Sequence, residues 1–353
     1  LQWNENVDAV DGPLPKDAHD RIYFTGQDFP RVGSEASMIS GSTYPAASFR
    51  LGVKEPTLPG NIGLARAANN LDTETPNTVC YVFTYVTGFG EEGPPSLATA
   101  TIDVTDTQTN GSTNQTVTIS NLPTAISYSS GGVFATGHKL RIYRSNTGSN
   151  TTAFQFVGET TSFGGSFVDA LDGDQLGEVI PSTYWIGPPD DTSATYPEGP
   201  MLGLTALPNG IFAGFAGRRL CFSEPYLPHA WPVSYRITTE DKIVGIAMAG
   251  NALLVTTEGN PYIVMGADPS SMQAVRLEAA YACTNKRSIV DMGDYAMYAS
   301  PDGLVAVAGN EVQLVTESLI DPFDWANNYA PTTIQGFLHE GTYVGFYNTC
   351  LLY

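Results

Sequence analysis

The chain has 353 residues, which at about 100 to 200 residues per domain allows two or three domains with well-filled cores. Only 15% of the residues are charged, while Gly (36), Pro (24), Tyr (18) and Phe (16) are abundant, a mix that is typical of short strands joined by tight turns and argues against a mainly helical protein. The formal net charge of -20 disfavours tight binding along a nucleic-acid backbone, because like charges repel.

The dispersal of cysteine and histidine argues against a metal site or a disulfide framework. The four cysteines have no CxxC spacing and lie among apolar neighbours, so we expect buried free thiols at Cys80, Cys221, Cys283 and Cys350. The histidines form no HExxH or HxH group, so we expect no zinc and no other cofactor. No apolar run approaches the ~18 residues of a membrane span. The chain begins at Leu1 inside a strand-like run and stops in a strand at Tyr353, so we expect it to be part of a longer protein.

The first 70 residues are predicted to form one or more sheets followed by a linker. Residues 21–25 and 29–32 are apolar runs on either side of Gly26, a pattern that predicts a β-hairpin. Residues 58–70 lack a useful periodicity, so we interpret them as a linker with one helical turn at 65–68. We assign 1–70 to an N-terminal propeller blade and this linker.

Residues 76–184 are predicted to form a separate, inserted β-sandwich. Short alternating or aromatic runs recur through this stretch, as an immunoglobulin-like or fibronectin-like sandwich of about seven strands requires. Six of these strands are expected at residues 79–86, 98–104, 115–122, 139–144, 153–157 and 165–169.

Residues 195–353 repeat one plan, an apolar strand, a glycine turn and a second apolar strand. The leading glycines Gly210, Gly250, Gly293 and Gly341 lie 40, 43 and 48 residues apart. That period agrees with the ~40 to 50 residues of a four-stranded propeller blade. The sequence therefore predicts an all-β protein, a partial or complete β-propeller into which the sandwich is inserted.

Several runs resemble a family of virion structural proteins of tailed bacteriophages. They are residues 81–86, 90–96, 140–145, 176–178, 207–210, 221–225, 228–232, 259–262 and 286–293. In architecture the chain is similar to tail nozzle proteins of short-tailed phages, whose propeller-bearing subunits form a ring on the DNA-ejection conduit. The resemblance implies a non-enzymatic tail protein in the virion, with copies of itself and portal-adaptor or other tail proteins as partners. An acidic surface would suit a conduit through which DNA slides.

Two other functions stay open at this point. In the first alternative, the chain is a tail protein that binds a host-surface receptor or glycan, with the inserted sandwich as its binding module. A polysaccharide-degrading propeller enzyme is the third reading, but no pair of carboxylates stands out in the sequence and no nucleophile motif is present.

One acidic segment and two loops supply the candidate site residues. Asp169, Asp172 and Asp174 belong to a run of four acidic residues within ten, and carboxylate oxygens are the ligands that calcium prefers. The spacing does not match an EF-hand loop, so a solvated turn is the favoured interpretation. Interface candidates are aromatic or rigid: Tyr226 and Trp231 in a proline-stiffened loop, and Phe89, Glu91 and Glu92 at a tip of the sandwich. For Trp231, packing within its own blade is an equally favoured alternative.

Overall fold

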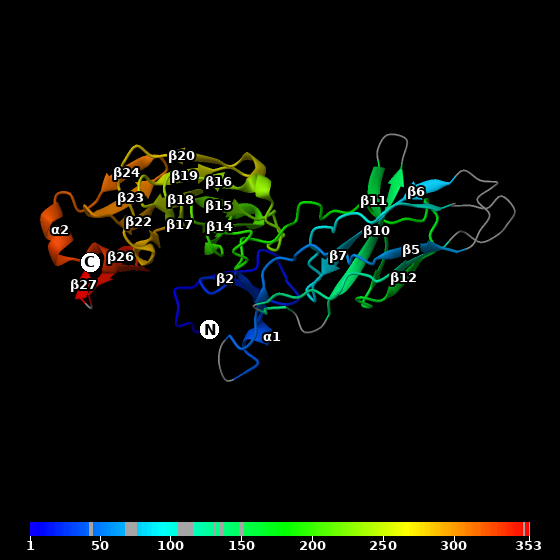
Figure 1. Ribbon diagram of the computed structural model, residues 1–353. Coiled ribbons are helices and arrows are strands. Elements are labelled where there is room, and N and C mark those ends of the chain that lie inside the picture. Colours follow the sequence, from blue (N-terminus) through cyan, green and yellow to red (C-terminus); the bar gives the residue numbers. More distant parts are fainter. Residues whose placement is uncertain are drawn as a thin grey trace. The chain divides into compact units, whose positions relative to one another are not determined.

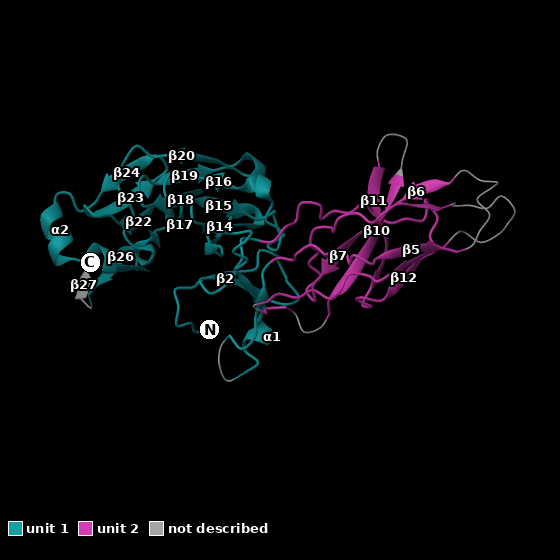
Figure 2. Ribbon diagram, in the orientation of Figure 1, with its two compact units in different colours: residues 1–51, 188–353 teal, residues 52–187 magenta. Residues whose placement is uncertain are grey.

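The computed structural model describes residues 1–41, 45–67, 76–104, 116–129, 131–133, 137–147, 152–348 and 350–352. These residues are nearly all in β-strands, turns and extended segments, so the protein is all-β as predicted. The chain divides into two compact units, which Figure 2 shows in separate colours. Unit 1 comprises residues 1–51 and 188–353, and unit 2 is the stretch 52–187 that interrupts it in the sequence.

Within its described residues, unit 1 contains five antiparallel sheets that follow one another along the chain (Figure 1). In each sheet the strands pair in sequence order, and in the first four sheets there are four of them. The first two sheets are β1 (Asp8–Asp11), β2 (Arg21–Thr25), β3 (Arg31–Ser34) and β4 (Phe49–Arg50), then β13 (Leu202–Leu207), β14 (Ile211–Ala216), β15 (Arg219–Phe222) and β16 (Ile237–Thr238).

The remaining three sheets complete unit 1. Their strands are β17 (Ile243–Ala249), β18 (Ala252–Thr257), β19 (Tyr262–Met265), β20 (Gln273–Arg276), β21 (Val290–Asp291), β22 (Ala296–Ala299), β23 (Leu304–Ala308), β24 (Glu311–Leu314), β25 (Gln335–His339), β26 (Thr342–Tyr347) and β27 (Cys350–Leu352). Short helices connect the strands of unit 1: α1 (Glu35–Met38), α2 (Pro322–Asn328), and the 3-10 turns η2 (Pro208–Gly210), η3 (Val233–Tyr235), η4 (Pro269–Ser271), η5 (Lys286–Ser288) and η6 (Pro331–Thr333).

The repeated glycines mark the same turn in four of these sheets. Gly210, Gly250, Gly293 and Gly341 each precede the second strand of a sheet, and all four have a positive φ, between 63° and 95°. Glycine adopts this backbone conformation without the steric cost that a side chain would bring. The predicted repeat is therefore a repeat of structure.

The sheets of unit 1 pack in series and share their cores. The first strands β1, β13, β17, β21 and β25 contact one another in that order. The second strands β14, β18 and β22 are buried along their whole length, whereas β20 and β24 are largely exposed. Phe215 and Leu220 of the second sheet cluster with Leu253 of the third, and Leu254 of the third clusters with Tyr298 of the fourth. Each sheet is thus covered by the next.

Unit 2 is built from two three-stranded antiparallel sheets and a strand pair, again in its described residues. The sheets have the orders β11-β10-β7 and β12-β9-β5, and the pair is β6-β8. The bounds are β5 (Gly63–Arg66), β6 (Asn77–Val79), β7 (Tyr81–Val86), β8 (Ile102–Val104), β9 (Val117–Ser120), β10 (Lys139–Thr147), β11 (Thr152–Thr160) and β12 (Ser166–Asp169).

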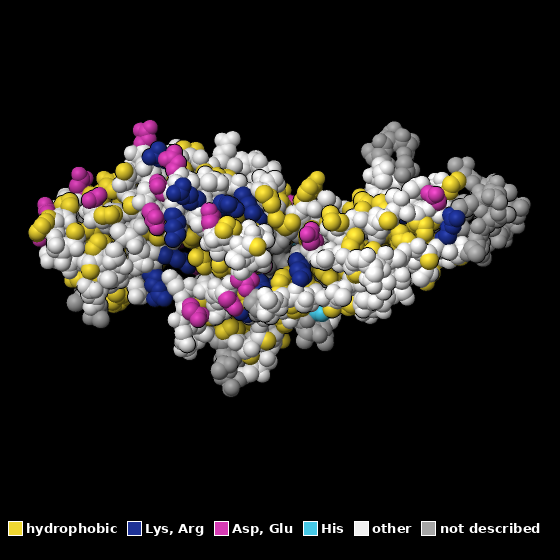
Figure 3. All heavy atoms as spheres, viewed as in Figure 1, with side chains coloured by type: hydrophobic (Ala, Val, Ile, Leu, Met, Phe, Trp, Pro, Cys, Tyr) yellow, Lys and Arg dark blue, Asp and Glu magenta, His cyan; other side chains and the backbone are white. Residues whose placement is uncertain are grey.

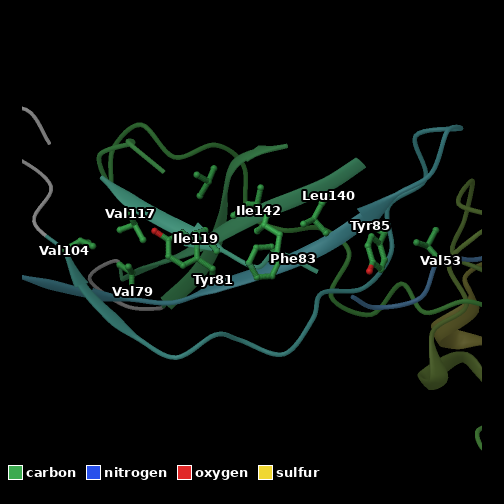
Figure 4. Close-up of a cluster of buried hydrophobic side chains, with 12 residues drawn as sticks. Val53, Val79, Tyr81, Phe83, Tyr85, Val104, Val117, Ile119, Leu140 and Ile142 are labelled. Carbon is green, nitrogen blue, oxygen red and sulfur yellow. The ribbon is translucent and has the colours of Figure 1, made fainter. Parts of the chain in front are cut away.

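Both sheets of unit 2 contribute to one hydrophobic core. Alternate residues of β7, namely Tyr81, Phe83 and Tyr85, turn toward side chains of β9 and β10 (Figure 4). Ile119 and Ile142 are fully buried against them. The alternating aromatics that predicted a strand here are therefore the core face of that strand.

Two local predictions in this region are wrong. Residues 63–66, expected in a linker with a helical turn, form β5, whose Leu64 pairs with Ile119 of β9 and packs on the core of unit 2. Four strand residues are too few for periodicity to reveal, and only the partner strand defines them. The strand expected over 79–86 is interrupted at Cys80, where β6 ends and β7 begins.

The unit boundaries lie outside the predicted ones. Unit 2 begins at Gly52 and ends at Gly187, whereas the sequence suggested 76 and 184. A Cβ built on Gly187 would lie 3.3 Å from the Cα of Gly52, so the two ends of the unit lie side by side. Adjacent ends are what an insertion into another fold requires. No helix in the described part of the chain is long and apolar enough to cross a bilayer.

Replacement of a shared core residue should destabilise unit 1 strongly. Leu254 is fully buried between the third and fourth sheets, so we expect Leu254→Ala to lower the free energy of unfolding by about 2 to 5 kcal/mol. Leu319→Ala is the matched control, because Leu319 is 77% exposed, and it should change stability by less than ~0.5 kcal/mol. Urea unfolding followed by tryptophan fluorescence measures both. Equal effects of the two variants would show that the sheets do not share this core.

Candidate functional site

The structure brings Asp8 and Lys286 together from opposite parts of the sequence. Asp8 lies in β1 and Lys286 in η5, and their side chains form an ion pair. The same Asp8 oxygen accepts a hydrogen bond of 3.1 Å from the backbone N–H of Gly203 in β13. This carboxylate therefore links the first sheet, the second sheet and the connection that enters the fourth.

Gly245 of β17 leaves space beside the Asp8–Lys286 ion pair. A Cβ built on Gly245 would lie 2.4 Å from Cδ1 of Ile289 and 3.3 Å from Cγ of Lys286. The absence of a side chain in this part of β17 lets the η5 segment approach the strand. Sequence spacing could not reveal the pair, since its members lie 278 positions apart in the chain.

Of the two aromatic interface candidates in the second sheet, one is exposed and one is not. Tyr226 is 46% exposed and has a positive φ of 60°. Its ring covers Gly210, where a Cβ would approach it to 2.5 Å. Trp231 is fully buried, and its indole N–H donates to the carbonyl of Pro228 at 2.7 Å. Trp231 is therefore not a surface anchor, and its indole is held within its own loop.

The acidic residues of the predicted sandwich tip are buried. Glu91 and Glu92 are each 4% exposed, and Phe89 before them is half-buried. Glu92 accepts hydrogen bonds from the hydroxyls of Thr84 and Tyr143, both at 2.6 Å, and pairs with Arg141 at 2.7 Å. The expectation that Glu91 and Glu92 face a partner is wrong, because both side chains are buried and the Glu92 carboxylate joins β7 to β10 inside the unit.

The pKa of Tyr143 is shifted by burial and by the neighbouring Glu92 carboxylate. Loss of solvent, followed by the hydrogen bond to Glu92, raises the pKa of Tyr143 well above its usual value. Tyr143 thus stays protonated and remains a hydrogen-bond donor. These hydrogen bonds connect β7 and β10 to the segment that carries Glu92.

Asp169, the first residue of the suggested calcium segment, is already committed to protein partners. One of its oxygens accepts from the hydroxyl of Tyr81 and from Arg144, both at 2.8 Å, and the other accepts from the backbone N–H of Leu171 at 3.0 Å. Burial, and then the neighbouring Asp169, raises the pKa of Tyr81. Asp169 is therefore the anion of a buried ion pair.

Asp172 and Asp174 do not join Asp169 in a metal site. The Asp172 backbone bonds to Gln175 in a turn, and Asp174 is exposed. Among the described residues, no three His, Cys, Asp or Glu side chains come close enough together to hold a metal ion. The segment is therefore a turn, and its carboxylates do not form a calcium site.

The thiols follow the sequence prediction at two positions. Cys221 and Cys283 are buried and free. Burial raises the pKa of each thiol to about 11. Cys80 is free but half-buried, and the side chain of Cys350 lies outside the described residues.

No protein-family model matches the sequence, and no curated protein matches it. Among solved structures, the chain is similar to YCF48 from Cyanidioschyzon merolae, with a TM-score of 0.28 and 11% identity. That similarity covers 60% of this chain and 73% of the other. A likeness of this size carries no argument about fold or function.

Removal of the buried Asp169 charge should lower the free energy of unfolding far more than removal of an exposed charge. Asp169→Asn keeps the shape but leaves Arg144 buried without its counter-ion, so we expect a loss of about 3 to 5 kcal/mol in unfolding free energy. Glu159→Gln is the control, because its pair with Lys139 is solvent-exposed and should be worth ~0 to 1 kcal/mol. Denaturant unfolding of both variants measures the difference, and a loss below ~1 kcal/mol for Asp169→Asn would contradict a buried structural pair.

The buried thiols should resist alkylation until the protein unfolds. At pH 8 we expect Cys221 and Cys283 to react with iodoacetamide slower in the native state than in denaturant by a factor on the order of 100. These thiols ionise at a lower pH in the unfolded state than in the native state. Their contribution to the free energy of unfolding therefore falls as the pH rises from about 8.5 to about 11. Mass spectrometry with Cys80 as the internal reference gives the rates. Native labelling of Cys221 or Cys283 as fast as that of Cys80 would count against their burial.

Proposed function

We propose that unit 1 is a partial β-propeller and that unit 2 is an inserted sandwich of the immunoglobulin or fibronectin type. Support for the propeller comes from consecutive antiparallel sheets whose first strands contact one another in order, as blades around an axis do. Support for the sandwich comes from two sheets that share one core.

We infer that the chain is a non-enzymatic structural component of a bacteriophage tail, a ring or nozzle subunit on the DNA-ejection conduit. The observation that carries this proposal is the series of sheets that share cores and are linked by buried or half-buried ion pairs, including Asp8–Lys286. Such a unit suits a rigid structural role. The resemblance of the sequence to phage virion proteins is the reason for placing the chain in the phage particle.

The surface charge agrees with a conduit role. With 36 acidic against 16 basic residues, the chain repels the phosphates of DNA, so the nucleic acid would pass without being held. On the face of unit 1 drawn in Figure 3, Asp and Glu side chains lie among those of Lys and Arg. Acidic and basic side chains on one face allow ion pairs with a neighbouring subunit.

Exposed aromatic side chains offer contacts for assembly. Phe323 of α2 is 74% exposed, and Phe337 of β25 is 52% exposed. Phe337 packs edge-on against Phe346 of β26, with 5.9 Å between the ring centres. Contiguous exposed apolar side chains, such as this aromatic pair, are typical of interaction surfaces, so copies of the chain or tail adaptor proteins are the partners we propose.

Quantitative mass spectrometry and an electron-microscopy map of the virion that contains this chain test the tail-ring function. A ring subunit should be present in about six or about twelve copies and lie on the portal axis. The alternative, a tail protein that binds a host-surface receptor or glycan through unit 2, predicts a peripheral position. A chain found off the axis, or missing from the particle, would contradict the ring proposal.

A further inference from the structure

One arginine of unit 1 has no partner within the chain. Arg218 lies in the turn between β14 and β15, where its side chain is exposed and its guanidinium makes no hydrogen bond, ion pair or ring contact among the described residues. Every other arginine in the described part of the chain has its guanidinium beside a carboxylate, a carbonyl or amide oxygen, or an aromatic ring. Arg218 is therefore the arginine that is free to meet a second molecule.

The backbone that carries Arg218 is fixed. The Arg218 carbonyl accepts hydrogen bonds from the N–H and the hydroxyl of Thr239, at 2.9 Å and 3.1 Å. The Gly217 carbonyl accepts from the N–H of Ile243 at 3.0 Å. A side chain on an ordered turn loses less conformational entropy on binding than one on a mobile loop. The chain thus presents this guanidinium from a defined position.

A rigid aromatic surface lies at the opposite end of the same sheet. Tyr226 occupies the third position of the turn 224–227, which is closed by a 3.2 Å hydrogen bond from the Leu227 N–H to the Glu224 carbonyl. Its φ of 60° is typical of glycine or asparagine at this position, and a larger residue adopts it only against a steric cost. The ring covers Gly210 on one side, and the side chain is still 46% exposed. The turn therefore holds an accessible aromatic ring in place.

Two carboxylates without ion pairs belong to the same surface. Glu224 begins the Tyr226 turn, and its Oε1 accepts from the Tyr235 hydroxyl at 3.1 Å. Asp268 is exposed, and the backbone just before it accepts a hydrogen bond of 3.2 Å from the side chain of Asn209, in the turn beneath the Tyr226 ring. Burial, and then the charges of Glu224 and Asp268, raise the pKa of Tyr235, as two carboxylates near one phenol do. Neither acid pairs with a Lys or Arg of the described residues.

This combination of an aromatic ring and two carboxylates fits an arginine side chain. A guanidinium stacks on an aromatic face and pairs with carboxylates at the same time, which the compact ammonium of a lysine does less well. Val233 of the neighbouring η3 is 61% exposed and offers an apolar surface to the methylene groups. An anion is disfavoured, because both charged groups of the surface are acidic. Tyr and Arg are also enriched among the residues that dominate the affinity of protein interfaces.

Arg218 of the same molecule does not reach this surface. The six residues of β14 separate the Gly210 turn from the Arg218 turn, and at about 3.4 Å per residue they span roughly 20 Å. That distance exceeds the length of an arginine side chain. A second copy of the chain, placed head to tail, brings its own Arg218 to the Tyr226 turn of the first.

We propose that copies of this chain associate head to tail, with Arg218 of one copy bound by Tyr226, Glu224 and Asp268 of the next. The inference rests on the proposed function, because it names the contact between the copies of the proposed ring. Contacts between two different surfaces generate a ring when the rotation from copy to copy closes. In this contact the two carboxylates balance the guanidinium charge, and the tyrosine supplies the stacking surface.

Sedimentation velocity of the intact chain over a concentration series tests the contact. We expect the wild-type chain to self-associate, and added salt to weaken the association. Arg218→Glu should raise the dissociation constant about tenfold or more, because it brings a third carboxylate to the other two. Tyr226→Gly should do the same by removing the ring, while glycine tolerates the positive φ of the turn. Thermal unfolding of both variants verifies that the fold is kept.

Lys242→Glu is the matched control. Lys242 is an exposed cation without an ion pair in the described residues, and the next residue, Ile243, bonds to the Arg218 turn, so the variant makes the same charge change close by. It should leave the dissociation constant unchanged. An equimolar mixture of Arg218→Glu and Tyr226→Gly chains retains one intact contact per pair. The mixture should form dimers and nothing larger, although neither variant associates alone.

A chain that stays monomeric at every concentration would overturn the proposal, as would equal losses in all three variants or a mixture that stays monomeric. A short arginine-containing peptide is titrated in parallel. Its binding to the Tyr226 surface of a chain that does not self-associate would assign the site to another basic protein and refute the contact between copies. These results are separate from the test of the tail-ring function. A monomeric chain that lies on the portal axis of the virion would refute this contact and leave the proposed function standing.

Discussion

The structure of unit 1 depends on one constraint, that a four-stranded sheet cannot bury both of its apolar faces by itself. The strands β14, β18 and β22 are apolar on both faces and are buried throughout. Each therefore needs a neighbouring sheet on either side. The shared clusters, together with the contact of Tyr23 with Phe212, show that it has them. If stability adds up as it does in repeat proteins, it combines the intrinsic stability of each sheet with nearest-neighbour terms between sheets. Loss of the contacts between two sheets would then weaken both of them.

A second constraint arises because the chain leaves unit 1 after residue 51 and returns at residue 188. Arg50 lies at the point of departure and is buried. Its guanidinium forms a bidentate pair with Asp191, with distances of 2.8 Å and 3.1 Å, and stacks over Phe29 at 3.8 Å. Bidentate geometry is more directional than a single charge contact. The two segments of unit 1 are thus held together where the long insertion would otherwise let them separate.

The sequence predicted the parts of the fold that are set by local chemistry. The hairpins around Gly210, Gly250 and Gly293 were found because a turn glycine and its flanking apolar runs lie within a few residues of one another. It could not predict β5, which is defined only by its pairing with β9. The same limit applies to the sites, since Asp8 and Lys286 meet across most of the chain. Acidic residues next to glycine and proline suggested a surface loop, but Glu92 is buried because Arg141 and Tyr143 on another strand supply its partners.

Ion pairs serve the same end in both units. In unit 1 the pairs Asp8–Lys286 and Arg50–Asp191 join segments that are distant in sequence and so hold the sheets in place. In unit 2 the buried pair Arg144–Asp169 joins β10 to β12. Removal of either member of such a pair leaves a charge without its counter-ion in a poorly solvated site, which costs more than the pair itself contributes. The pairs therefore oppose partial separation of the strands that they connect.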